Sequence, residues 1–170
     1  MEDREAALLR RVAGGESAAM EELYHACAGR VLAYLLSRGL GQQEAADVLQ
    51  ETFLAAWRGA GRYQGGSRPL TWLIGIARHK LADWHRRRPE EAPLPEGGPE
   101  PAWDPMRQTA EQVTLRQAVA SLGDEQRELL DLIFQQGLNY NEAAEVLGVP
   151  EGTIKSRMHR LKRELAERMA

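Results

Sequence analysis

The sequence contains few of the residues that build disulfide scaffolds, β-sheets or membrane spans. Its one cysteine, Cys27, cannot form a disulfide bond within the chain. Aromatic residues make up 6% of the 170 residues and clusters of β-branched residues are scarce, which disfavours a protein built from strands. The apolar run at 31–36 is far shorter than the roughly 20 residues that cross a bilayer. Because Ala, Leu, Glu and Arg are abundant instead, the composition predicts an all-α protein.

The sequence also lacks the patterns of a secreted protein or a metalloenzyme. The charged stretch 1–11 has no apolar core of a signal peptide, so we expect a cytoplasmic protein without membrane insertion. The four histidines have no metal-ligand spacing with one another or with Cys27: His25, His79, His85 and His159. We therefore expect no catalytic residues, no metal and no cofactor. We expect Cys27 to fill a helix as a small apolar residue rather than to act as a redox sensor.

The net charge of −3 conceals an uneven distribution. Residues 1–88 contain 13 Lys and Arg against 10 Asp and Glu, whereas residues 89–108 contain one against five. Residues 109–170 contain eight against ten, yet 150–163 alone contains five against one. Since the distribution of charge decides nucleic-acid binding more than its sum does, the short stretch 150–163 is a candidate DNA contact.

Prolines mark a boundary between two domains. Six of the eight prolines fall within 88–105, which is acidic and has no apolar periodicity. Proline breaks helices and like charges repel, so we interpret 89–108 as a flexible, acidic linker. The sequence therefore predicts two small helical domains, 1–88 and 109–170. Cores of this size are marginal, and we expect partner binding to stabilise them.

Apolar periodicity predicts four helices in each domain. In the first domain we expect helices at 3–13, 17–37, 42–59 and 69–87, and in the second at 109–121, 124–136, 139–147 and 150–168. The glycine-rich stretch 59–67 is predicted to be a loop, and it lacks the lysine and the spacing of a phosphate-binding loop.

The last two predicted helices have the pattern of a helix-turn-helix. Asn139 and Glu142 have capping-box spacing, and Gly148 marks a turn, after which Pro150 suits the first position of the next helix. An apolar stripe predicts the buried side of that helix: Ile154, Met158, Leu161 and Leu165. Polar residues lie opposite or on the flanks: Lys155, Ser156, Arg157, His159, Arg160, Lys162 and Arg163. Such side chains can bond base edges and phosphates, so we favour a DNA-recognition helix over a merely solvated basic face.

Two helices of the first domain also have faces that point away from a predicted core. On 46–57 the outer face is polar around one apolar side chain, which suits a protein partner with basic groups: Asp47, Gln50, Glu51 and Leu54. On 68–88 the predicted core face is Leu70, Leu73, Ile74, Ala77, Leu81 and Trp84, and the outer face is Trp72, His79, Asp83 and Arg86. An exposed Trp72 could stack on bases, and the arginines at 86–88 could bind phosphates or merely stabilise the helix end.

Two blocks of sequence resemble a known family, the extracytoplasmic-function (ECF) sigma factors of bacterial RNA polymerase. DVLQETFLAAW at 47–57 and TWLIGIARHKLADWHRRR at 71–88 resemble the family patterns D-x-x-Q-E-x-F-x-x-x-W and T-W-L-x-x-I-A-R-N-x-x-x-D-x-x-R-R. GLNYNEAAEVLGVPEGTIKSRMHRLKREL at 137–165 resembles G-x-S-Y-x-E-I-A-x-x-L-x-x-x-x-G-T-V-K-S-R. The order of the blocks and the linker between them also agree, and the match covers most of both domains.

The resemblance implies a role for each surface. It places contact with the clamp helices of the polymerase core on Asp47, Gln50, Glu51 and Leu54. It places capture and melting of the minus-ten promoter element on Arg62, Tyr63, Ser67, Trp72, Arg78, His79, Asp83 and Arg86. It places recognition of the minus-thirty-five element on Lys155, Ser156, His159 and Arg160, with the remaining candidate DNA contacts on the same helix: Arg157, Lys162 and Arg163. It also implies a monomer when free of partners, and an anti-sigma factor that holds the protein inactive and can retain it at the membrane.

Three positions depart from the family patterns. His79 stands where Asn is usual, which leaves the minus-ten specificity open. Gly123 stands where Pro is usual, so we expect a looser start of the helix that follows. Asn139 replaces Ser or Thr, which is an acceptable change of helix cap.

Two other functions stay open on the residues alone. A stand-alone helix-turn-helix regulator would explain 139–165 and would bind duplex DNA by itself, usually as a dimer, but it would leave the blocks before the linker unexplained. The second alternative is an interaction protein whose basic helix binds an acidic protein partner. Strongly salt-dependent DNA binding would argue against this alternative.

Overall fold

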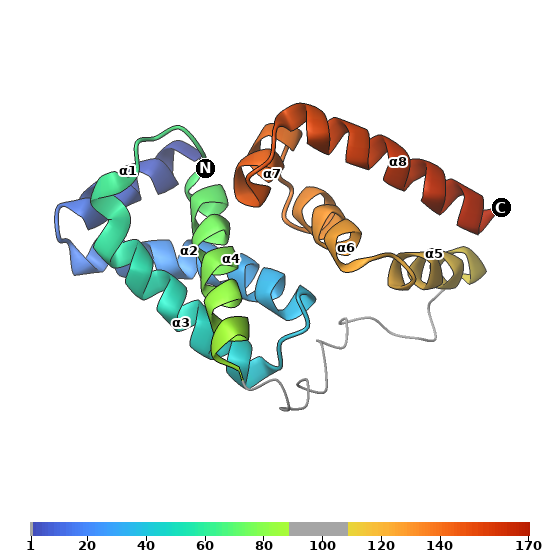
Figure 1. Ribbon diagram of the computed structural model, residues 1–170. Coiled ribbons are helices and arrows are strands. Elements are labelled where there is room, and N and C mark those ends of the chain that lie inside the picture. The colour runs from blue at the N-terminus through green and yellow to red at the C-terminus, as the bar shows by residue number, and fades with distance from the viewer. Residues whose placement is uncertain (1, 89–108) are drawn as a thin grey trace. The chain divides into compact units, whose positions relative to one another are not determined.

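The computed structural model describes residues 2–88 and 109–170, with side chains from Arg4 onward in the first range. Within these ranges the regular structure is helical and there is no strand, which confirms the all-α prediction. The chain divides into two compact units, Met1–Pro99 and Glu100–Ala170 (Figure 1). The linker predicted at 89–108 lies outside the described residues.

Four α-helices build the first unit, drawn blue to green in Figure 1: α1 (Glu2–Ala13), α2 (Ser17–Ser37), α3 (Gln42–Gly59) and α4 (Pro69–Arg87). Helices α2, α3 and α4 pack on one another, and α1 packs against all three. Their shared core includes Leu9, Leu23, Val31, Tyr34, Leu35, Leu73 and Ile74, which are completely buried. The predicted helix bounds agree with these to within one residue. The predicted loop at 59–67 is shorter than expected, because Gly59 ends α3 and a 3-10 turn, η1, follows at Ala60–Arg62.

Both predictions for the tryptophans of α4 are wrong, because each side chain is half-buried. Trp84, predicted to lie in the core, is half-buried, and the guanidinium carbon of Arg88 lies over its ring at 5.3 Å from the centroid. Trp72, predicted to be exposed, is also half-buried because the ring of Tyr63 lies against it, with centroids 5.5 Å apart. The five aliphatic residues predicted on the core face are buried as expected: Leu70, Leu73, Ile74, Ala77 and Leu81.

The second unit consists of α5 (Ala110–Ala120), α6 (Asp124–Leu130), a π-helical turn η3 (Asp131–Gln135), α7 (Tyr140–Leu147) and α8 (Glu151–Met169). Helix α8 packs against α5, α6 and α7. The prediction of one continuous helix over 124–136 is wrong in its last turn. There the Gln136 N–H donates to the Asp131 carbonyl, five residues back, at 2.9 Å. This wider turn leads into Gly137, whose φ of +69° redirects the chain toward α7.

The predicted helix-turn-helix is formed by α7 and α8. The capping box at its start is present: the Glu142 N–H donates to Asn139 Oδ1 at 2.8 Å, and the Asn139 N–H donates to Glu142 Oε1 at 3.3 Å. Gly148 ends α7 in the left-handed region, with φ +68°. Pro150 precedes α8 as its N-cap instead of taking the first helical position, so that detail of the prediction is wrong.

The start of α6 has a side-chain contact despite the glycine that precedes it. The Gly123 N–H donates to Gln126 Oε1 at 3.1 Å, and Gln126 Nε2 in turn donates to Glu164 Oε2 on α8 at 3.0 Å. One glutamine therefore caps α6 and also connects it to α8.

Replacing Gly148 with alanine should lower the free energy of unfolding by about 1 kcal/mol, because only glycine adopts this left-handed conformation without strain. An added Cβ would meet no atom within 4 Å there, so steric overlap would contribute nothing. Gly152→Ala is the matched control: its added Cβ is also unobstructed, but it lies inside α8, where alanine is favoured by about 0.5–1 kcal/mol. Urea unfolding of both variants checks this, and equal effects would contradict it.

Candidate functional site

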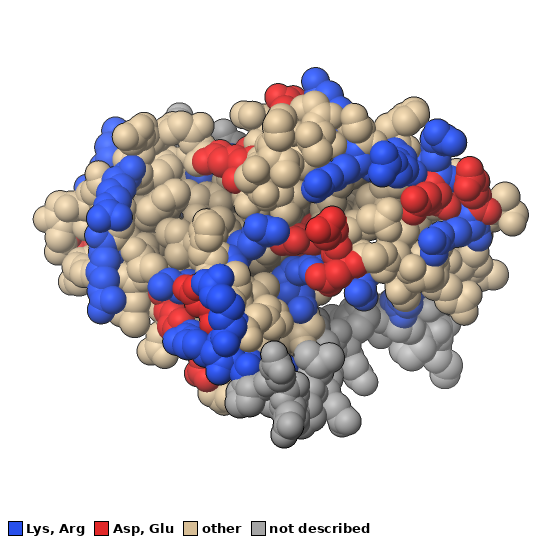
Figure 2. All heavy atoms as spheres, in the orientation of Figure 1, with Lys and Arg blue, Asp and Glu red and all other residues tan. Residues whose placement is uncertain are grey.

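Helix α8 separates a buried side from a polar side. Ile154, Met158 and Leu161 are at most 1% exposed, whereas Leu165, predicted to be buried with them, is half-buried near the end of the helix. The residues predicted to contact DNA are all exposed: Lys155, Ser156, Arg157, His159, Arg160, Lys162 and Arg163. Lys and Arg side chains accordingly gather along α8 in Figure 2, with some acidic ones among them. The buried stripe fixes the rotation of α8 about its axis and so determines which side chains face outward.

The cations of α8 differ in their surroundings. Lys155 Nζ lies 3.6 Å from Glu151 Oε1 one turn earlier, which partly offsets its charge. Arg157 and Arg160 border a hollow of about 410 Å³ that also contains Asp124 and Glu125 at the start of α6.

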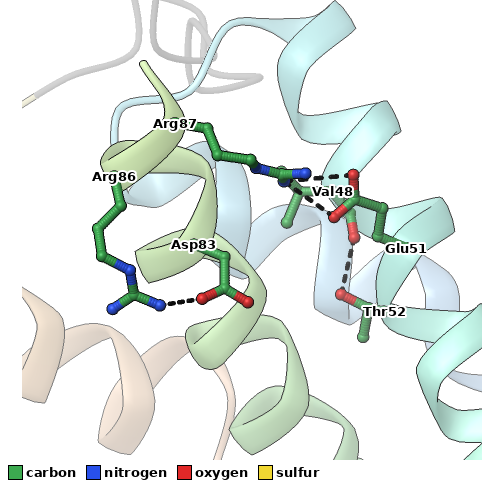
Figure 3. A network of polar contacts seen from close by, with 6 residues as sticks. All are labelled: Val48, Glu51, Thr52, Asp83, Arg86 and Arg87. Atoms are coloured by element: carbon green, nitrogen blue, oxygen red, sulfur yellow. Dashed lines mark hydrogen bonds and ion pairs between the residues drawn. The ribbon is translucent and has the colours of Figure 1, made fainter. Parts of the chain in front are cut away.

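In the first unit, the outer face of α3 combines polar groups with one apolar side chain, as predicted. Asp47 and Gln50 are exposed, Leu54 is 51% exposed and Glu51 is half-buried. Figure 3 shows why Glu51 is less accessible: Arg87, in the last turn of α4, points at its carboxylate with Nη2 3.2 Å from Oε2.

An apolar groove runs beside this face, between α2 and α3. It has a volume of about 750 Å³ and is lined by Ser17, Met20, Glu21, Tyr24, Ala46, Leu49, Gln50, Phe53, Leu54 and Trp57. Tyr24 and Trp57 are 41% and 38% exposed, and neither is among the predicted site residues. Trp57 could have been found, because it lies three residues after Leu54 on the same side of α3. Tyr24 could not, since α2 is apolar on several sides and its period does not single out one exposed residue.

The predicted minus-ten residues form one cluster and a row along α4. In the cluster, Tyr63 packs on Trp72 and its hydroxyl donates to the Ser67 carbonyl. That hydrogen bond closes the loop around Gly65, whose φ of +76° allows the tight reversal. His79 is exposed further along α4, followed one turn later by Asp83, and Arg62 is exposed in η1. Arg78 is half-buried.

The arginines at 86–88 each have a different neighbour within the protein. Arg86 pairs with Asp83 on its own helix, Arg87 reaches Glu51 on α3, and Arg88 lies over Trp84. From the sequence, all three arginines are expected either to bind phosphates or to stabilise the helix end. The structure instead gives each arginine a different environment.

Cys27 is buried in α2 at 1% exposure, in agreement with its interpretation as a small apolar residue. Burial and, to a smaller extent, the neighbouring Glu5 carboxylate together raise the pKa of its thiol to about 12, with Arg30 partly opposing the shift. The thiol therefore stays protonated near neutral pH and is a poor nucleophile. In the ranges 2–88 and 109–170, no group of three or more His, Cys, Asp and Glu is placed to hold a metal ion. No helix in these ranges is long and apolar enough to cross a membrane.

Comparison with known proteins adds two family matches and several relatives. Residues 23–90 match the model of Sigma-70 region 2, and residues 112–165 match that of Sigma-70, region 4. RNA polymerase sigma factor YlaC of Bacillus subtilis is 33% identical, over 88% of this chain and 91% of its own length. ECF RNA polymerase sigma factor SigC of Mycobacterium tuberculosis is 40% identical, over 77% of this chain and 71% of its own length.

Two solved structures have a similar fold at 25% sequence identity. One is CnrH in complex with the cytosolic domain of CnrY, with a TM-score of 0.69 over 96% of both chains. The other is the sigma factor RpoE in complex with the anti-sigma factor NepR from Bartonella quintana, with a TM-score of 0.68 over 88% of this chain and 95% of that one.

The buried thiol provides a test of the first unit's core. At pH 8 the native protein should not react with a disulfide reagent such as 5,5′-dithiobis(2-nitrobenzoate), because the thiolate is scarce and the sulfur is inaccessible. In 8 M urea one thiol per chain should react within the mixing time. Absorbance of the released thiolate measures both cases, and rapid reaction of the native protein would contradict the buried position.

Proposed function

The chain belongs to the extracytoplasmic-function sigma factors of bacterial RNA polymerase, and on this basis we propose how its surfaces divide the recognition of a promoter. As a sigma factor it binds the polymerase core and promoter DNA and directs transcription initiation, and it is not a stand-alone regulator. Sigma factors are initiation factors without enzymatic chemistry, and we assign this chain no catalytic residue, metal or cofactor. We place it in the cytoplasm, where the polymerase acts.

The outer face of α3 and the adjoining groove form the proposed polymerase-binding surface. Asp47, Gln50 and Glu51 offer acceptors to basic side chains, while Leu54 offers apolar area beside them. The groove enlarges that apolar area, with Tyr24 and Trp57 at its open side. Aromatic anchors surrounded by polar groups are the usual composition of protein interfaces. The observation that carries the proposal is this groove beside an acidic face, a combination that suits a protein partner with basic side chains.

The cluster at the start of α4 is the proposed site for an unpaired minus-ten base. Trp72 and Tyr63 present partly exposed aromatic rings, on which a base leaving the duplex can stack. Arg62 and Ser67 flank the cluster in the chain and would bond that base. The row along α4 would contact the DNA strand beyond it: Arg78, His79, Asp83 and Arg86. His79 can donate or accept a hydrogen bond according to its tautomer, so its base preference need not follow that of asparagine.

The outer face of α8 is the proposed reader of the minus-thirty-five element. Its N-terminal half follows a tight turn, the arrangement with which a helix-turn-helix enters the major groove. Ser156, His159 and Arg160 lie where they can reach base edges, and the flanking cations can contact phosphates. We also propose an anti-sigma factor as a partner, because the structurally similar sigma factor RpoE was solved in complex with the anti-sigma factor NepR.

Run-off transcription from a promoter library tests the function as a whole. Purified bacterial core polymerase should produce transcripts with the protein that it does not produce alone, and their promoters should share two upstream elements. Each element would reflect one DNA-binding surface. The proposal would be contradicted if core polymerases from several related bacteria gave no such transcripts while the protein alone bound and shifted duplex DNA.

Replacing Arg160 with alanine should weaken holoenzyme binding at the minus-thirty-five element by about 1–3 kcal/mol if the arginine makes a bidentate guanine contact. Binding to core polymerase should stay unchanged. Arg168→Ala is the matched control, since Arg168 lies on the same helix, outside the proposed face, and contacts Ser121. Quantitative footprinting on promoters with single base changes measures the effect. If the base preference is unchanged at every position, Arg160 does not contact bases.

A further inference from the structure

One ion pair joins the two helices that carry the proposed polymerase-binding and minus-ten surfaces. Arg87 Nη2 donates to Glu51 Oε2 at 3.2 Å and to Glu51 Oε1 at 3.4 Å, across 36 residues of sequence. Both side chains remain partly accessible, at 62% and 41% for arginine and glutamate. Figure 3 shows the two approaching each other from α4 and α3.

Arg87 differs from its neighbours in where its charge is directed. Arg86 pairs with Asp83 on α4 itself, and Arg88 lies over the ring of Trp84, also on α4. The Arg87 pair, in contrast, reaches from α4 to α3, and it ends on a residue of the proposed polymerase-binding surface. The guanidinium of Arg87 is therefore directed at that surface, whereas Arg86 and Arg88 stay on α4.

The pair restricts the position of the Glu51 carboxylate. A glutamate on an exposed helix face samples several rotamers, and fixing it at the moment of binding costs conformational entropy. Two hydrogen bonds from Arg87 reduce that freedom before any partner arrives. The carboxylate retains acceptor capacity, because its two oxygens offer about four lone-pair sites and Arg87 occupies about two.

The backbone beneath Glu51 is held as well. Thr52, the next residue, is completely buried, and its hydroxyl donates to the Val48 carbonyl at 2.8 Å (Figure 3). The turn of α3 that carries Glu51 therefore packs on the core through Thr52 on its inner side, and Arg87 contacts it on its outer side.

We propose that Arg87 is a positioning residue of the polymerase-binding surface, which preorganises the Glu51 carboxylate for a basic side chain of the polymerase core without itself touching the polymerase. This inference rests on the proposed function of the α3 face. It also assigns one residue of the minus-ten helix to polymerase binding, a role that the block TWLIGIARHKLADWHRRR does not reveal by its sequence.

The test is the affinity of the full-length protein for bacterial core polymerase, measured by competition with a labelled sigma factor. Glu51→Gln should weaken binding more than Arg87→Gln, which should weaken it by about 2–5-fold, the effect of losing one exposed ion pair. The double variant should equal Glu51→Gln alone, because Arg87 acts only through Glu51. Arg87→Lys should recover part of the loss, since it keeps the charge. Arg10→Gln, an exposed charge change on α1, should have no effect.

Both single variants remove the same ion pair, so urea unfolding should show a small loss of stability in each, and Arg87→Gln should lose slightly more because its cation also stabilises the C-terminal end of α4. If the pair were merely structural, both would also weaken polymerase binding equally, and that result would overturn the proposal. Additive losses in the double variant would overturn it too, because they would mean that Arg87 contacts the polymerase itself.

The variant Leu54→Ala distinguishes failure of the role of Arg87 from failure of the proposed polymerase-binding surface on α3. If Leu54→Ala and Glu51→Gln weaken binding while Arg87→Gln does not, the polymerase-binding surface stands and the role of Arg87 fails. If Leu54→Ala weakens binding and Glu51→Gln does not, the surface stands without a role for the ion pair. If neither weakens binding, the assignment of the α3 face is wrong and the role of Arg87 falls with it.

Discussion

The proposed polymerase-binding and minus-thirty-five surfaces are the outer sides of helices whose inner sides are buried in a small core. The constraint is clearest in α8, where Ile154, Met158 and Leu161 have no other place to be buried in a unit of this size. Rotating the helix by one residue would expose that stripe and bury charged groups, at a cost of several kcal/mol. The rotation of α8, and with it the set of outward side chains, therefore follows from core packing. The same holds for α3, where Ala45, Thr52 and Ala56 are completely buried.

Features that depend on local periodicity could be predicted from the sequence, and features that depend on distant side chains could not. The bounds of α1 to α4, the Asn139 cap and the Gly148 turn follow from residues close together in the chain, and the structure confirms them. The half-buried state of Trp72 depends on Tyr63, which approaches from the preceding loop. The Arg87–Glu51 pair and the groove beside Tyr24 each require the packing of two helices, which no local pattern specifies.

The first unit leaves apolar area uncovered for a reason connected with its size. A four-helix unit of fewer than a hundred residues has little core to spare, yet Tyr24, Leu54 and Trp57 remain at the surface. Contiguous apolar area of this kind is costly in water and usually marks a protein interface. A polymerase or another protein partner that covers the groove would bury this apolar area, and that burial would contribute favourable free energy to binding.

The separation of the two sides of α8 also bears on evolution. The residues that hold the helix, including Glu164 through Gln126, do not belong to the proposed reading face. Substitutions on that face therefore need not disturb the fold, and substitutions in the core need not change which bases are read. After gene duplication, one copy can acquire a new promoter by changing a few exposed side chains while it keeps the same polymerase. A genome can in this way accumulate many parallel regulators on a single scaffold.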